Sequence, residues 1–141
     1  MIVVVDASVA IKWFLAESPR EDYADQALAI LAKAAQGDIT LVQPSHFMAE
    51  VCAVLARLKP EQALDDLFDL LQMAQRSAQG PEIYAAAIDL SIRYQHHLFD
   101  TLYHAVALHT PGAVLVTADR RYFDKVKVEG QIVWLGDFTF A

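Results

Sequence analysis

Short runs of β-branched apolar residues alternate with longer helical patterns along this sequence, and this alternation limits its possible folds more than any other feature. The apolar runs predict strands at residues 2–5, 39–42, 113–116 and 132–134. Short strands without polar alternation are typical of a parallel sheet that is buried on both faces. Because helical segments separate the strands, we expect an α/β fold with helices on both sides of a central parallel sheet.

Helical periodicity is clear over most of the remaining sequence. We expect helices at residues 8–15, 21–35, 45–58, 61–76, 82–95 and 100–109, and a short turn or helix around 120–124. Ser45, which follows Pro44, is a candidate N-cap. Residues 45–109 show four helices and no convincing strand, so part of this stretch is expected to form a helical layer or arm.

Composition limits the class of protein further. The 141 residues are 55% hydrophobic and contain no repeat or linker, which predicts a single domain over residues 1–141. No apolar run approaches the ~20 residues of a membrane helix, and the N-terminal run lacks a basic flank, so we expect neither a membrane span nor a signal peptide. The lone Cys52 excludes an internal disulfide and fits a reducing cytoplasm. A net charge of −7 argues against a broad electrostatic grip on nucleic acid, but it suits a basic protein partner.

Carboxylates follow two of the predicted strands. In open α/β sheets, sites form beyond the carboxyl ends of the strands. Asp6 follows the first strand and Asp119 follows the strand at 113–116, so we expect both at one edge of the sheet. Each has a hydroxyl residue two positions away: Ser8 after Asp6, and Thr117 before Asp119. These hydroxyls are candidates for supporting hydrogen bonds.

Two further acids belong to predicted helices. Glu50 lies on the inward, apolar stripe of the helix at 45–58, where an unpaired carboxylate is costly. Asp100 begins the helix at 100–109.

Apart from Lys12, Arg120 and Arg121, few basic residues are expected near the sheet edge. Clustered carboxylates need a counterion, and oxygen ligands select hard cations such as Mg²⁺ or Mn²⁺. Such ions support phosphoryl transfer.

Each acid also has a purely structural interpretation. Asp6 is a possible helix cap, and Asp119 a possible turn residue. The helix dipole would stabilise Asp100, and Glu50 would be stable as a buried partner of Arg57 or Arg93. The expected convergence of four acids favours a site over four separate explanations.

Four segments in order resemble the motifs of the PIN-domain family, and most closely its VapC-like toxin ribonucleases of toxin–antitoxin pairs. They are "VVDASVAIKWFL", "FMAEVCAVLAR", "LFDTLYHAVAL" and "LVTADRRYF". The resemblance implies a three-layer α/β/α sandwich and a cytoplasmic, metal-dependent endoribonuclease that cleaves RNA. It also implies an antitoxin whose basic segment covers the site, and a homodimer.

Carried over motif by motif, the resemblance implies an acidic pocket in which Asp6 and Asp100 are the first candidates for direct Mg²⁺ or Mn²⁺ ligands. Its residues are Asp6, Glu50, Asp100 and Asp119, with Ser8 and Thr117 in support.

The remaining polar residues are assigned structural roles. His104 lies one helical turn after Asp100 and is expected to be partly buried with a local hydrogen bond. His96 and His97 are expected to be solvated in a loop, and Asp124 is interpreted as a surface turn acid.

Three other classes of protein are alternatives. A receiver-like signalling domain would need paired acids after the first strand, and a haloacid-dehalogenase-like phosphatase would need an acid in place of Ser8. A catalytically silent PIN fold that only binds a partner is also an alternative, although all four acids are present.

Overall fold

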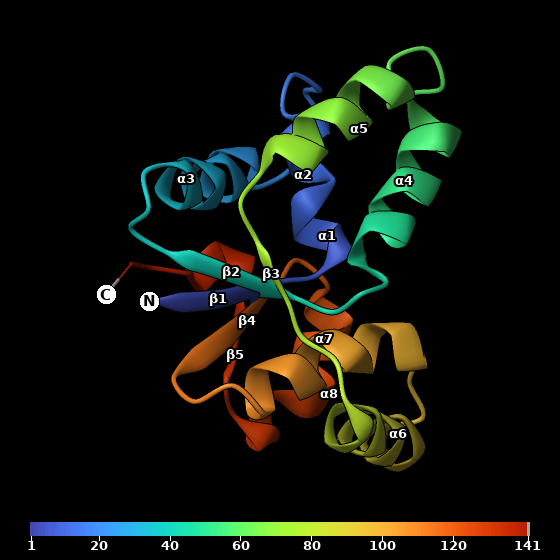
Figure 1. Ribbon diagram of the computed structural model, residues 1–141. Helices are drawn as coiled ribbons and strands as arrows, with labels where there is room; N and C mark the ends of the chain where they lie inside the picture. The colour runs from blue at the N-terminus through green and yellow to red at the C-terminus, as the bar shows by residue number, and fades with distance from the viewer. Residues whose placement is uncertain (141) are drawn as a thin grey trace.

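The structure, a computed structural model, describes residues 1–140, and within them five parallel strands form one sheet in the order β3-β2-β1-β4-β5 (Figure 1). The strands are β1 (Ile2–Val5), β2 (Thr40–Gln43), β3 (Arg76–Ser77), β4 (Ala113–Thr117) and β5 (Ile132–Trp134). The predicted α/β fold with a central parallel sheet is therefore confirmed. The sequence did not predict β3, because this edge strand has two exposed polar residues and no apolar run.

Helices cover both faces of the sheet. They are α1 (Ala7–Ala10), α2 (Lys12–Leu15), α3 (Ala24–Ala35), α4 (Phe47–Leu58), α5 (Ala63–Gln72), α6 (Pro81–Tyr94), α7 (Leu98–Leu108) and α8 (Arg120–Val126). Short 3₁₀ turns follow at Lys127–Glu129 and Leu135–Asp137. In Figure 1, α1–α3 lie above the sheet and α6 and α7 below it, while α4 and α5 extend upward as an arm. The predicted helical arm is therefore present. None of the helices in this part of the chain has the length and apolar character needed to cross a lipid bilayer.

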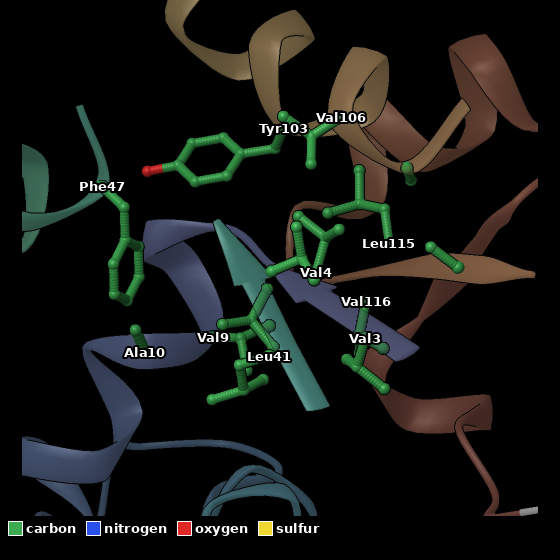
Figure 2. Close-up of a cluster of buried hydrophobic side chains, with 14 of the residues drawn as sticks. Val3, Val4, Val9, Ala10, Leu41, Phe47, Tyr103, Val106, Leu115 and Val116 are labelled. Carbon is green, nitrogen blue, oxygen red and sulfur yellow. The ribbon is translucent and has the colours of Figure 1, made fainter. Parts of the chain in front are cut away.

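The central strand β1 is apolar because both of its faces are covered. Val4 lies opposite Leu115 in the register of β1 and β4, and both pack toward Tyr103 and Val106 of α7 (Figure 2). Val3, on the opposite face, is fully buried as well. Burying a valine side chain contributes roughly 1.5–3 kcal/mol, so this strand anchors the residue that follows it.

A side-chain amide completes the carboxyl end of β1. Backbone pairing between β1 and β2 is limited to Ile2 with Thr40 and Val3 with Leu41. Beyond these pairs, the buried side chain of Gln43, at the end of β2, replaces backbone pairing. Its Oε1 accepts from the Val5 N–H at 2.9 Å, and its Nε2 donates to the Val5 carbonyl at 2.7 Å. Both polar groups of the residue before Asp6 are thereby satisfied.

Several helix starts differ from the sequence expectation. The helix expected to begin at residue 21 begins at Ala24, because the buried Lys12 ammonium takes the Glu21 carboxylate and the Asp22 carbonyl, each at 2.7 Å. Tyr23 then turns the chain with a φ of 59°.

The assignment of Ser45 as an N-cap was wrong. The Pro44 carbonyl accepts from the Phe47 N–H in a turn, so α4 begins two residues after Ser45 and has no side-chain cap.

Candidate active site

Asp6 ends β1 and is held by three hydrogen bonds. The Ser8 hydroxyl donates to Oδ1, the Thr117 hydroxyl donates to Oδ2 at 2.5 Å, and the Val9 N–H donates to Oδ1 at 3.3 Å. The Val9 contact makes Asp6 the N-cap of α1, so its structural interpretation is also correct. The expected supporting bonds from Ser8 and Thr117 are present.

The two hydroxyls are fixed in direction by the backbone. Ser8 Oγ accepts from the Ala118 N–H, and Thr117 Oγ1 accepts from the Asp119 N–H, each at 3.0 Å. Each hydroxyl therefore has its own proton free for Asp6. The Asp119 carboxylate caps α8 through the Tyr122 N–H at 3.0 Å. These bonds connect the ends of β1 and β4 into one frame.

Burial makes ionisation of Asp6 unfavourable. Its side chain is buried, and this raises the pKa from 3.8 to about 6, although the bonds from Ser8 and Thr117 oppose the rise. The negative charge of Asp100 raises it further. An acid with a raised pKa beside another acid is typical of functional sites, where a cation normally compensates the repulsion.

Glu50 comes to the same place from the arm. Its Oε1 accepts from the buried Tyr103 hydroxyl at 2.7 Å and lies 3.2 Å from His46 Nε2. Burial opposes ionisation, but the bonds from His46 and Tyr103 lower the pKa of Glu50 overall. The predicted partners Arg57 and Arg93 are wrong, since Arg93 instead binds Asp89 and Glu129.

Asp100 lies in the first turn of α7, next to His96 and Asp119. Single ligand atoms of these three residues all lie within 4.8 Å of one another. His96 Nε2 is 2.9 Å from Asp100 Oδ2. Burial raises the pKa of Asp100, His96 lowers it, and the charges of Glu50 and Asp119 raise it. Asp100 thus interacts electrostatically with each of the other three acids, and we call Asp6, Glu50, Asp100 and Asp119 the carboxylate cluster.

No lysine or arginine compensates the charge of the carboxylate cluster within residues 1–140. Within residues 1–140, no lysine or arginine forms an ion pair with any of its four members. Lys12, which the sequence places near this edge, is committed to Glu21. Several oxygen donors with mutual repulsion and no lysine or arginine partner fit a hard divalent cation. Asp6, Glu50, Asp100 and Asp119 are the residues that would hold it.

Two residues beside the cluster were not predicted as part of it. His96 was expected to be solvated, but its side chain is 11% exposed and contacts both Asp100 and Lys125. Tyr103 is fully buried, and its hydroxyl donates to Glu50. No helical signal in the sequence indicated the contact between His96 and Asp100, because His96 lies in the loop before α7.

Other sequence assignments agree with the structure. His104 is buried and contacts the Tyr122 hydroxyl at 3.2 Å and the Gly130 carbonyl at 2.8 Å, away from the cluster. Asp124 is a surface acid beside Arg120.

A separate hollow of about 810 Å³ lies where the arm meets α2 and α3. Trp13, Phe14, Leu28, Leu31, Lys59 and Asp66 are among its lining residues. No member of the carboxylate cluster lines it.

One family model matches most of the chain. The model of the PIN domain family matches residues 3–129. No curated protein sequence matches the chain significantly. Three solved structures are similar to this chain. The first is VapBC-1 from nontypeable Haemophilus influenzae, and the second is VapC20 from Mycobacterium tuberculosis, a toxin that cleaves the sarcin–ricin loop. The third is VapBC2 from Rickettsia felis, bound to a DNA fragment from the VapBC2 promoter.

The structural agreement extends over most of each chain. For the Haemophilus protein the TM-score is 0.66 at 16% identity, covering 97% of this chain and 100% of that one. For the Mycobacterium protein the values are 0.61 and 16%, covering 82% and 87%. For the Rickettsia protein they are 0.64 and 18%, covering 95% and 97%. At such identities the likeness establishes the fold.

Proposed function

Because the chain belongs to the PIN domain family, we propose that it is a metal-dependent endoribonuclease and the toxin of a toxin–antitoxin pair. The observation that carries the proposal is the carboxylate cluster, in which four acids come together from four separate segments. The charges of Glu50 and Asp119 raise the pKa of Asp100, the charge of Asp100 raises the pKa of Asp6, and no lysine or arginine of residues 1–140 pairs with the four acids. The similar solved structures, one of a toxin and two of VapBC proteins, support the assignment.

The cluster's residues have separate tasks in this proposal. Asp6 and Asp100 would ligate Mg²⁺ or Mn²⁺ directly, with Glu50 and Asp119 completing the acidic pocket. A bound divalent ion lowers the pKa of a water and stabilises charge on phosphate oxygens. Ser8 and Thr117 keep the Asp6 carboxylate oriented by donating to its two oxygens. Tyr103 does the same for Glu50.

We also infer that residues 1–141 form a single domain. Asp6 and Thr117 are 111 positions apart and meet in one hydrogen bond, which supports this inference.

RNA cleavage with and without metal tests the proposed activity. Total cellular RNA should be cut in the presence of Mg²⁺ or Mn²⁺ and left intact in excess EDTA. Asp6→Asn should abolish cleavage, whereas the matched control Asp124→Asn, at a surface acid, should leave it unchanged. Full cleavage in chelator would overturn the metal requirement. A wild type that binds metal but cuts no RNA would instead support the alternative of a silent PIN-fold binding module.

The antitoxin proposal has its own test. An acidic pocket on a chain of net charge −7 favours a partner with a basic segment. Co-expression with the product of the neighbouring gene should give an inactive complex whose association slows as salt rises. Separate elution of the two proteins at low salt would contradict it.

The homodimer proposal is supported by an apolar stripe on α6. Tyr84, Ile88 and Ile92 recur every four residues and are 42%, 49% and 71% exposed. Light scattering should show a dimer that Ile88→Asp converts to a monomer. A monomeric wild type at high protein concentration would refute the proposal.

A further inference from the structure

Contacts with several residues hold His96 in place. Its Nε2 lies 2.9 Å from Asp100 Oδ2, and its Nδ1 lies 3.1 Å from Lys125 Nζ on α8. The ring packs on Tyr122, with 4.6 Å between ring centroids. Its backbone is fixed too, because the carbonyl accepts from the Ser91 hydroxyl. A loop residue with this many contacts has a defined orientation.

Two roles are compatible with its position beside Asp100. His96 belongs to the group with Asp100 and Asp119 whose ligand atoms lie within 4.8 Å, so it is a candidate nitrogen ligand for a metal ion. Alternatively, it donates a hydrogen bond to Asp100 and leaves metal binding to the carboxylates.

Lys125 decides between these roles. A lysine ammonium has three donors and no acceptor, so the Nδ1 atom that it contacts must be the acceptor. In a neutral imidazole only one nitrogen carries a proton. That proton is therefore on Nε2, which faces Asp100. A protonated ring nitrogen has no lone pair for a metal ion.

We propose that His96, oriented by Lys125, is a positioning residue that donates its Nε2–H to Asp100 Oδ2 and leaves Oδ1 available for the divalent ion. The proposal rests on the proposed metal-dependent function and extends it in one respect. By keeping the imidazole out of the coordination shell, Lys125 makes the site an oxygen site. Oxygen sites favour Mg²⁺ and Mn²⁺, whereas imidazole favours Zn²⁺ or Ni²⁺.

The tautomer of His96 is the first test, and it needs no metal and no activity. At about pH 8, the imidazole nitrogen shifts in ¹⁵N nuclear magnetic resonance of the metal-free protein should show Nε2–H with unprotonated Nδ1. In Lys125→Met this preference should weaken, because nothing then donates to Nδ1. A proton on Nδ1 in the wild type would overturn the proposal.

Metal affinity is the second test. Calorimetry should show that His96→Leu binds Mg²⁺ about 10–100-fold more weakly, as is usual when a hydrogen-bond partner of a ligand is removed. His96→Gln keeps an amide donor on a side chain of similar reach and should recover most of the affinity. The matched control is His97→Leu at the exposed neighbouring position, which should bind as the wild type does.

Metal selectivity is the third test. Lys125→Met frees Nδ1 to carry the proton, and Nε2 then becomes a ligand. Its affinity for Zn²⁺ relative to Mg²⁺ should rise at least about tenfold. If His96→Leu fails to fold, the metal selectivity of Lys125→Met and the tautomer of His96 in the wild type still test the positioning role.

The outcomes distinguish a failure of the positioning role of His96 from a failure of the proposed nuclease function. Unchanged Mg²⁺ affinity in folded His96→Leu, or unchanged selectivity in Lys125→Met, overturns the positioning role and leaves the proposed nuclease intact. A wild type that binds no divalent ion overturns the proposed function, and the positioning role with it.

Discussion

Replacing Asp6 by asparagine should stabilise the metal-free protein while abolishing cleavage. The pKa of Asp6 is raised from 3.8 to about 6, chiefly by burial. At about 1.4 kcal/mol for each pKa unit, ionising this group in the folded chain costs roughly 3 kcal/mol of stability. Asparagine carries no charge, so the variant avoids this cost.

The lost hydrogen bonding reduces the gain. Asp6 accepts from Ser8, Thr117 and Val9 through two oxygens, and asparagine has only one. The Ser8 and Thr117 hydroxyls each accept from a backbone N–H and donate their own proton to residue 6. With only one oxygen at residue 6, one of these two protons loses its acceptor. That loss costs about 1 kcal/mol. We therefore expect Asp6→Asn to be more stable by about 1–2 kcal/mol near neutral pH.

The gain should depend on pH in a defined direction. Since the pKa of Asp6 is higher in the folded than in the unfolded chain, the free energy of unfolding of the wild type should fall as the pH rises from 3.8 to about 6. Below this interval Asp6 is protonated in both states. The advantage of the variant should then vanish or reverse by about 1 kcal/mol.

Urea denaturation in EDTA at about pH 3 and about pH 8 measures the difference. Added Mg²⁺ should stabilise the wild type more than the variant, because a ligand stabilises the state that binds it. A variant that is no more stable than the wild type at the higher pH, and that still cleaves RNA, would refute the reasoning and leave Asp6 as a helix cap.

Three further substitutions address other contacts of the same frame. Gln43→Leu leaves the Val5 N–H and carbonyl buried without partners, so urea denaturation should show a free energy of unfolding lower by roughly 2–4 kcal/mol. The control Gln72→Leu, at an exposed position on the arm, should change it little. Tyr103→Phe removes a donor that lowers the pKa of Glu50, so the acidic limb of the pH–rate profile should move to higher pH; an unmoved limb would separate Glu50 from the reaction. Glu50→Gln keeps the shape but removes one charge, so calorimetry should show weaker Mg²⁺ binding together with lost cleavage; unchanged binding would take Glu50 out of the metal site.

Sequence patterns predicted the parts of the fold that depend on local apolar spacing. The run at residues 2–5 indicated a buried strand, and the structure confirms β1 at Ile2–Val5. Ser8 and Thr117 were expected to give supporting hydrogen bonds, Ser8 beside Asp6 and Thr117 beside Asp119. The structure shows both hydroxyls donating to Asp6, because parallel strands bring their carboxyl ends to one edge.

Contacts that depend on side chains from distant elements were not predictable in the same way. Tyr103 and Glu50 are 53 positions apart, and no local pattern indicates that a buried tyrosine will bind a carboxylate on the arm. Lys125 reaches His96 across 29 positions, so the loop composition around His96 indicated solvent exposure instead. The strand β3 was missed because its hydrogen bonds, and not its side chains, define it.

The hydrogen bond from Thr117 to Asp6 has a consequence for synthesis of the chain on the ribosome. Its two residues are 111 positions apart. At about 5–20 residues per second, on the order of 6–20 s separates their translation. During that interval the nascent chain holds Asp6 without Thr117 or Asp119. The proposed nuclease is therefore incomplete while most of it is being made, and the ribosome that synthesises it is not exposed to a finished active site on that same chain.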